Sequence, residues 1–289
     1  MVEIKQFDTL VFESPSVAVG AFRCPRWHPR FRDSGPIENH VFVFPRRAVR
    51  LCHEGGEPFV ADPGVVTFYN RGQRYWRAAL GGADDCEWFA VEPGVLLDAV
   101  REFDPSVDER PERPFKYERG PGNPLVYLEQ RTLFASLQDG RCPPDMLKVE
   151  ETVIRLLDAV LGRAYAFWTG PRVAPGPSGR QREMVDHAKV LLAERLTDPV
   201  GLAYFAREVG TSVFHLCRVF RAVTGSPLHA YRNHLRLQES LERLAEGAPL
   251  IDVALDLGYS SHSHFTEAFR RAFGSTPSAL RRRLGKPGG

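Results

Sequence analysis

The side chains best suited to chemistry gather in a short polar run near the end of the printed sequence. The run consists of His262, Ser263, Thr266, Glu267, Arg270 and Arg271. Between these residues, Phe265, Phe269 and Phe273 recur every four positions, so they share one face of a helix and leave the polar groups on the other. Gly258 suits the turn before this helix, and Ser261 suits its N-cap. The segment predicts a helix-turn-helix, with an ordinary helical hairpin and a solvated outer face as the alternative.

Two histidines in this run, His262 and His264, invite a metal-binding interpretation. Side chains at positions i and i+2 of a helix point ~200° apart, so these two imidazoles cannot bind one ion. We therefore expect no metal site at this pair of histidines.

An internal repeat strengthens the helix-turn-helix prediction. The repeated residues are Ala206, Gly210 and Ser212 with Ala254, Gly258 and Ser260; Phe220, Arg221 and Gly225 with Phe269, Arg270 and Gly274; and Pro227 with Pro277. A long helix of ~20 residues joins the two copies and spans ~30 Å, close to the ~34 Å turn of B-DNA. Two recognition helices at that spacing fit adjacent major grooves, so the repeat predicts a DNA-binding module.

Composition bounds the class of protein. The chain has 289 residues, of which 43% are hydrophobic and 26% charged, and this allows two ordinary globular domains. No apolar run approaches the ~18 residues of a membrane span, and the first residues lack a signal-peptide pattern, so we expect a cytoplasmic protein without a membrane partner. Residues 180–289 hold 16 Lys and Arg against 11 Asp and Glu, whereas residues 1–179 hold 22 against 25. A basic second half suits a polyanionic partner.

The order of patterns along the chain predicts two domains and a linker. Residues 1–115 alternate short β-branched and aromatic runs with Gly- and Pro-rich turns, which is typical of a sandwich or of a barrel that holds one small ligand. Residues 94–104 and 124–166 have helical periodicity, and these helices either pack internally or pair with a second copy of the chain. Residues 169–181 are rich in Pro and Gly, as in a linker, and residues 182–285 are helical throughout.

Matching positions in the second half point to a known family. In the first copy of the repeat they are Leu202, Ala203, Ala206, Gly210, Ser212, Leu216, Arg218, Phe220, Arg221 and Gly225. In the second copy they are Ile251, Ala254, Gly258, Tyr259, Phe265, Phe269, Arg270, Gly274 and Pro277. This pattern resembles the DNA-binding domain of the AraC/XylS family of bacterial transcription regulators, and the front half resembles the cupin-like sensor domain of that family.

The resemblance implies an α+β protein of two domains. The first, residues 1–168, would be a cupin-like β-barrel with flanking helices for sensing and dimerisation. A linker at 169–181 would lead to an all-α double helix-turn-helix of seven helices at 182–285. The implied function is a transcription regulator, such as an activator, that binds promoter DNA as a homodimer and responds to a small effector or a redox state. RNA polymerase is a further partner, and neither a cofactor nor an enzymatic activity is expected.

The resemblance also assigns individual residues to DNA. The base-facing positions fall on Phe214, Cys217 and Arg218 in the first copy of the repeat and on His262, Ser263, Thr266 and Glu267 in the second copy. Arg218 can pair bidentately with guanine. Cys217 and Glu267 depart from the family pattern, in which a longer polar side chain and an arginine are usual at these places. A thiol makes only weak hydrogen bonds, and a carboxylate can accept from cytosine N4 but is repelled by phosphates. Core packing is the alternative role for Phe214.

Two further sets follow from the same positions. Expected phosphate contacts are Arg221, Arg236, Arg270 and Arg271, with solvated surface charge as the alternative. Expected core residues are Leu202, Ala206, Leu216, Phe220, Ala254, Phe265, Phe269 and Phe273.

In the front half, effector contacts are expected from aromatic and arginine side chains that line the barrel. The candidates are Phe42, Phe44, Arg46, Tyr69, Arg74, Tyr75, Trp76 and Trp88. A second set, Cys24, His28, Cys52, His53 and Cys86, would suit a thiol or metal sensor if folding brought its members together. The alternative is a set of unrelated buried cysteines and surface histidines. A cupin-type metalloenzyme with an accessory helical domain is the competing function, but the histidines of the front half stand singly and lack a His-x-His pair.

Overall fold

The computed structural model describes residues 7–28, 31–139, 143–170 and 176–284. Its contacts divide the chain into two compact units. The first comprises residues 1–122 and 136–173, and the second comprises residues 123–135 and 174–289. Helix α2 (Pro124–Asp139) contributes residues to both units. Part of the expected linker, residues 171–175, lies outside the described residues.

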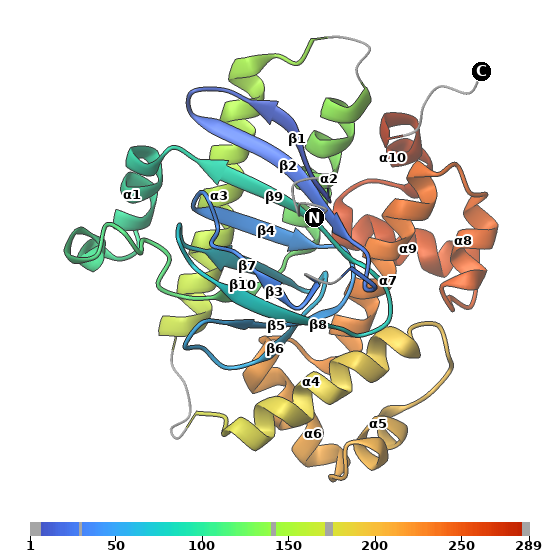
Figure 1. Ribbon diagram of the computed structural model, residues 1–289. Helices are drawn as coiled ribbons and strands as arrows, with labels where there is room; N and C mark the ends of the chain where they lie inside the picture. Colours follow the sequence, from blue (N-terminus) through green and yellow to red (C-terminus); the bar gives the residue numbers. More distant parts are fainter. Residues whose placement is uncertain (1–6, 29–30, 140–142, 171–175, 285–289) are drawn as a thin grey trace. The chain divides into compact units, whose positions relative to one another are not determined.

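The first unit is built on two antiparallel sheets (Figure 1). The strands are β1 (Asp8–Glu13), β2 (Val17–Cys24), β3 (Asp33–Ser34), β4 (Val41–Pro45), β5 (Val49–His53), β6 (Phe59–Ala61), β7 (Val65–Tyr69), β8 (Tyr75–Ala79), β9 (Asp84–Val91) and β10 (Arg119–Pro121). The larger sheet has the order β1-β2-β9-β4-β7-β10 and the smaller sheet β3-β8-β5-β6. The expected closed barrel is therefore not formed. Within the described residues each sheet keeps two end strands that pair on one side only.

The space between the two sheets is filled by side chains from both. Phe22, Val43 and Tyr69 of the larger sheet pack with Leu51 and Phe59 of the smaller one in a single buried cluster. Apolar burial of this kind is the main stabilising term of such a sandwich. The β-rich half of the prediction is confirmed in this coarser form, as a sheet-rich domain with a filled interior.

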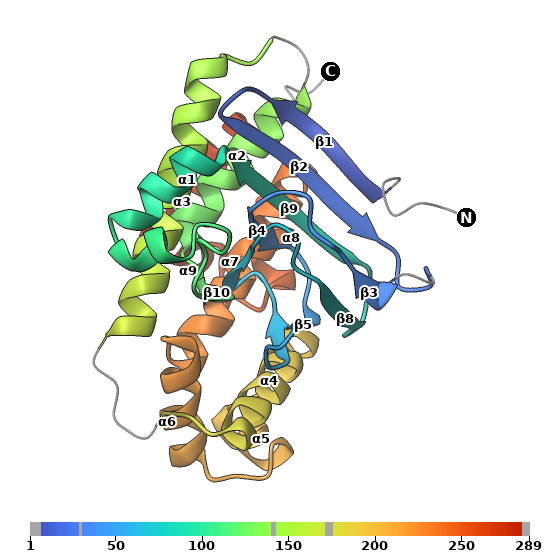
Figure 2. The ribbon, with the colours of Figure 1, turned by 60° about the vertical axis from the view of Figure 1, so that its left-hand side comes forward.

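Helices cover the opposite face of the larger sheet. Helix α3 (Met146–Thr169) crosses this face in Figures 1 and 2 and contacts β9 and β10. Helix α1 (Pro93–Arg101) and the short 3₁₀ helix η3 (Pro105–Glu109) pack beside it. Phe42, Phe44 and Phe89 contact one another within this layer, with ring centroids 5.3 to 6.0 Å apart; Phe42 stacks on Phe89, and Phe44 meets both rings edge-to-face.

The second unit is helical. Its elements are α4 (Gly179–Glu194), α5 (Leu202–Glu208), α6 (Val213–Thr224), α7 (Leu228–Ala245), α8 (Leu250–Asp256), α9 (His262–Phe273) and α10 (Pro277–Leu284). A capping box of Ser178 and Gln181 begins α4. Helix α7 has 18 residues and so spans about 27 Å. None of the helices in the described part of the chain combines the length and the apolar content needed to cross a membrane.

Candidate nucleic-acid interface and sensor interior

The turn of each helix-turn-helix has the same backbone geometry. Gly210 has φ +69° and Gly258 has φ +73°, a conformation that favours glycine. The amide of Thr211 donates to Ala206 O at 2.8 Å, and the amide of Tyr259 donates to Ala254 O at 3.0 Å. The repeat predicted from the sequence is thus present at the level of hydrogen bonds. The two copies are α5–α6 and α8–α9.

The second helix of each copy also begins and ends in the same way. The Ser212 hydroxyl accepts from the His215 amide at 3.2 Å, and the Ser261 hydroxyl accepts from the His264 amide at 3.1 Å. Both are N-caps. At the other end, Gly225 caps α6 and Gly274 caps α9, both in the left-handed conformation. These caps fix where each recognition helix starts and which residues it presents outward.

Most of the predicted core residues are buried. Ala206, Leu216, Phe220, Ala254, Phe265, Phe269 and Phe273 are each at most 4% exposed. Leu202 is the exception, with 39% exposed, so its prediction was wrong. Phe205 fills the core of the first copy in its place and is 1% exposed. Leu202 begins α5, where a side chain can turn away from the bundle.

The outer face of α6 joins one large aromatic ring to two free cations. Phe214 is 77% exposed, so it does not pack in the core. Arg218 and Arg221 are also exposed, and neither has an ion-pair partner among the described residues. Cys217 lies between Phe214 and Arg218 in the sequence and is half-buried. Since positions i, i+3, i+4 and i+7 share one helical face, this face can offer a guanidinium to a base edge and an apolar ring to a thymine methyl.

The outer face of α9 carries the equivalent positions with different chemistry. Ser263, Thr266, Glu267 and Arg270 stand 49 residues after the four positions of the α6 face. The Glu267 carboxylate accepts from Arg271 Nη2 at 2.6 Å, and both side chains are more than 70% exposed. A guanidinium in the first copy is therefore replaced by a carboxylate that holds a neighbouring cation. This pair lowers the positive charge that α9 can offer to phosphates.

The remaining residues predicted to contact DNA have mixed surroundings. His262 is exposed at the first position of α9. His264 lies within 3.0 Å of Ser260 Oγ and stacks edge-on against Tyr259, so it supports the turn. Arg270 is exposed, as a phosphate contact requires. Arg236 is half-buried, and its Nε donates to Leu196 O at 2.7 Å.

The interior of the first unit holds polar groups on the inner faces of β5, β7 and β8. His53 is 1% exposed, its ring lies 4.6 Å from that of Tyr69, and neither ring nitrogen has a hydrogen-bond partner within the described residues. Burial lowers the pKa of His53 to about 4, assisted by the charge of Arg119. Burial likewise raises the pKa of Tyr69 and Tyr75. These groups are neutral near pH 7.

Arg77 is a functional candidate that sequence reasoning missed. Its side chain is fully buried, its Nε donates to Phe31 O at 2.6 Å, and its Nη1 pairs with Asp84 at 2.6 Å. Its guanidinium also lies 4.6 Å from the centroid of the Phe22 ring. The signal lay in strand alternation, since Arg77 is two residues after Tyr75 and shares its face.

The predicted effector contacts fall on both sides of the sheets. Tyr69, Tyr75 and Trp88 pack on the interior cluster. Phe42 and Phe44 belong to the helix-covered layer instead. The last three candidates lie elsewhere: Arg46 has Asp85 and Glu87 at 4.0 and 3.6 Å, Trp76 is 37% exposed, and Arg74 is exposed.

The predicted thiol and metal set does not converge. Burial raises the pKa of the Cys24, Cys52 and Cys86 thiols, which disfavours the reactive thiolate. His28 is buried beside the ring of Phe7. The described residues contain no cluster of three or more His, Cys, Asp or Glu side chains able to hold a metal ion.

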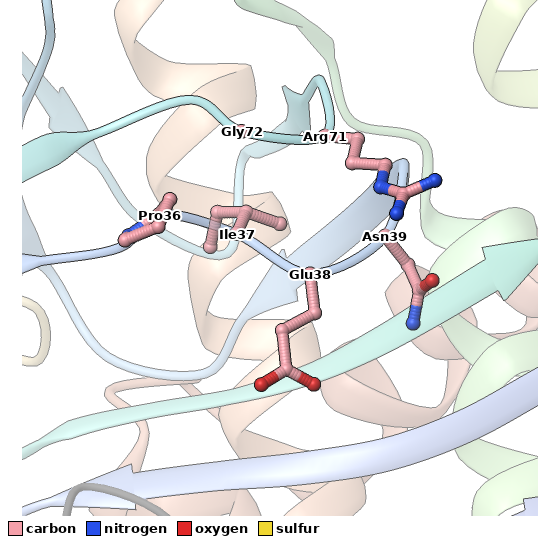
Figure 3. A pocket seen from close by; sticks show the side chains of 6 residues that line it. All are labelled: Pro36, Ile37, Glu38, Asn39, Arg71 and Gly72. Carbon is pink, nitrogen blue, oxygen red and sulfur yellow. The ribbon is translucent and has the colours of Figure 1, made fainter.

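A shallow hollow of about 540 Å³ lies at the β3–β4 connection (Figure 3). It is lined by Pro36, Ile37, Glu38, Asn39, Arg71 and Gly72. Backbone bonds from Ile37 N to Gln73 O and from Gly72 N to Ile37 O fix its two walls. Most of its lining is exposed. The hollow is thus a surface feature, separate from the polar groups of the interior.

Comparison with known proteins bears on the second unit above all. A family model described as a helix-turn-helix domain matches residues 205–283. Regulatory protein SoxS of Escherichia coli is 35% identical over 107 residues, which are 35% of this chain and 100% of SoxS. The right origin-binding protein of Escherichia coli is 37% identical over 94 residues, 32% of each chain. A solved AraC-type transcriptional regulator from Chromobacterium violaceum is 26% identical over 38% of this chain and 100% of its own, with a TM-score of 0.35. With a TM-score of 0.35, the similarity to the Chromobacterium violaceum structure supports no conclusion about this chain. The match to the whole of SoxS shows that this chain belongs to the AraC/XylS family of transcription regulators.

Proposed function

We propose that this DNA-binding transcription regulator recognises its promoter mainly through α6, and that α9 adds a weaker and different preference. The observation that carries the proposal is the exchange of Arg218 for Glu267 at equivalent positions of the repeat. Arg218 is free to form two hydrogen bonds to one guanine. Glu267 is engaged with Arg271, and its charge opposes the DNA backbone. The stronger base contact should therefore lie under α6.

The length of α7 supports simultaneous contact by both recognition helices. At about 27 Å it is comparable to one ~34 Å turn of B-DNA. Two helices separated in this way can enter successive major grooves on one side of a duplex. We expect a bipartite site whose two parts lie about one helical turn apart.

For the first unit, we propose that a small molecule is sensed in the interior of the sandwich, where it would displace part of the side-chain packing between the sheets. His53, Thr67 and Arg77 each keep a buried polar atom without a hydrogen-bond partner in the described part of the chain. Buried polar groups are usually satisfied by protein, water or ligand. A compact ligand with hydrogen-bonding groups would suit this site better than an aliphatic one.

Two partners besides DNA are proposed, a second copy of the chain and RNA polymerase. Leu147 and Ile154 are 65% and 37% exposed on α3, and they lie seven residues apart on one face of that helix. We propose that this face supports a homodimer. A contact with RNA polymerase would follow from promoter binding and stays a prediction.

The experiment that tests the proposal begins by selecting duplexes from a random pool with the full chain. Binding of a selected duplex should fall steeply with salt, with a log–log slope of about −0.9 per phosphate contact. Arg221→Ala should reduce the magnitude of the slope by about 1. Failure to enrich any duplex, or binding that does not change with salt, would overturn the proposal. Stoichiometric metal with turnover and no DNA binding would instead favour the enzyme alternative.

A further inference from the structure

A junction inside the second unit connects its two helix-turn-helix copies through more than the α7 rod. Its first part is the loop between α4 and α5, residues 195–200. Arg232 on α7 donates to this loop from Nε to Leu196 O at 3.1 Å and from Nη1 to Val200 O at 2.9 Å. Its Nη2 donates to Arg195 O at 3.2 Å and also to Asp198 O. Guanidinium donors so placed satisfy carbonyls at the C-terminal end of α4.

Arg236 stands one turn further along α7 and contacts both the α4–α5 loop and the second copy. Its Nε donates to Leu196 O at 2.7 Å in this loop, which follows α4, and α4 packs against α6 of the first copy. Its Cζ lies 6.0 Å from the centroid of the Tyr259 ring, in the turn of the second copy. The Tyr259 hydroxyl in turn donates to Asn233 Oδ1 at 3.0 Å. Burial lowers the pKa of Arg236, as expected for a guanidinium enclosed by these neighbours.

Gly258 is the point where the second turn meets the α4–α5 loop. A Cβ atom at this position would lie 2.7 Å from Thr197 O and 3.0 Å from Arg236 Nη2. The backbone of the second turn therefore approaches the α4–α5 loop too closely for any side chain at this position. Gly210, its equivalent in the first copy, has nothing within 4 Å of the same position. The close approach is thus specific to the junction and is not a general property of the repeated turn.

We propose that Arg236 is a positioning residue that sets the orientation of α9 relative to α6 before DNA is bound. The inference rests on the proposed function, in which both recognition helices meet one duplex. Fixing two binding elements in advance reduces the ordering cost of the second contact. It also restricts the separation of the two half-sites that the protein tolerates. Arg236 would then determine half-site spacing without touching a base.

The first test requires no DNA. Spin labels are attached to the full chain at positions 214 and 263 through an introduced keto amino acid, and their separation is measured by pulsed dipolar spectroscopy. The unaltered chain should give one narrow distance distribution. Arg236→Ala should broaden it, and Arg236→Lys should restore part of the narrowing because an ammonium can still donate to Leu196 O. Circular dichroism establishes that each variant is folded, and Arg236→Gln takes the place of the alanine variant if that one does not fold.

Arg232→Ala is the matched control. Arg232 binds the same loop from the same helix, but no contact with the second turn is present in the described residues. This variant should melt at a lower temperature and keep the narrow distribution. Equal broadening by Arg232→Ala would assign the positioning to the loop as a whole and overturn the role of Arg236.

The second test uses a duplex selected by the unaltered chain, and a copy with one base pair inserted between its two parts. The insertion should weaken binding by the unaltered chain about tenfold or more, and binding by Arg236→Ala only about threefold or less. A folded Arg236→Ala variant with a narrow distribution and the full spacing penalty would overturn the inference. If the chain selected no duplex, the proposed function would fail while the spin-label result still decided the role of Arg236.

Discussion

The two helix-turn-helix copies agree in backbone and differ in surface. Both turns contain a left-handed glycine and the same backbone hydrogen bond, both second helices begin at a serine N-cap, and both end at a left-handed glycine, although the second turn is one residue longer. Their outer faces differ, because the free Arg218 corresponds to the paired Glu267. Their turns also have unequal surroundings, since Gly258 is enclosed and Gly210 is open. A repeat can therefore conserve the parts that make a helix-turn-helix fold while the contacts for DNA and for the partner copy diverge.

The largest expected effect tests the shared core. Phe220 and Phe269 are equivalent and fully buried, so replacement of either by alanine should lower the free energy of unfolding by about 3–5 kcal/mol. Urea denaturation followed by circular dichroism measures this. Phe214→Ala is the control, because its ring is 77% exposed and should cost about 0.5 kcal/mol or less. A cost for Phe214→Ala close to that of Phe220→Ala would show that Phe214 belongs to the core.

Because the two turns have different surroundings, replacing their glycines by alanine should lower the free energy of unfolding by different amounts. Gly210→Ala should cost about 1–2 kcal/mol, which is the penalty of a left-handed alanine. Gly258→Ala should cost about 1–3 kcal/mol more, because its Cβ would overlap Thr197 O. Thermal unfolding of both variants under one set of conditions gives the difference. Equal melting temperatures would contradict the enclosed surroundings of Gly258.

The unequal outer faces predict unequal effects on DNA binding. Arg218→Ala should weaken binding to a selected duplex by about 1–3 kcal/mol while the chain stays folded. Glu267→Ala should change it by no more than about 0.5 kcal/mol, with any change toward tighter binding because Arg271 is released. Gel shifts at fixed salt measure both. Unchanged binding by Arg218→Ala, or a large loss with Glu267→Ala, would reverse the ranking of the two helices.

The smallest expected difference between the two copies concerns their equal caps. Ser212→Ala and Ser261→Ala should each cost about 1 kcal/mol, since each removes one N-cap hydrogen bond of similar length. The two losses should agree within experimental error when measured by denaturation. Clearly different losses would show that the two recognition helices do not start from equivalent caps.

How far the sequence predicts this molecule depends on the range of the interactions. The glycines, the capping serines and the spaced phenylalanines act within one helix or turn, so their roles were visible in the repeat. Leu202 was misjudged, and the contact of Arg236 with Leu196 could not be foreseen, because the surroundings of both residues come from segments distant in the sequence. The pairing of Glu267 with Arg271 was accessible from its i, i+4 spacing, although only cytosine and phosphate were weighed as neighbours of this carboxylate.

The front half shows the same limit more strongly. Strand composition indicated a β-rich domain, but strand pairing is a long-range property, and the two separate sheets replaced the expected barrel. Alternation along β8 would have placed Arg77 beside Tyr75. Its burial and its partner Asp84 depend on the neighbouring strands. Effector candidates chosen by residue type alone were therefore divided between the interior and the helix-covered face.

The central claim is that the two recognition helices contribute unequally to one bipartite site. The most direct measurement is the base-preference profile obtained by selecting duplexes from a random pool with the unaltered chain, with Arg218→Ala and with Glu267→Ala. We predict two conserved segments about one helical turn apart, a strong one that Arg218→Ala flattens and a weak one that survives it. Two segments of equal strength, both unaffected by Arg218→Ala, would contradict the account.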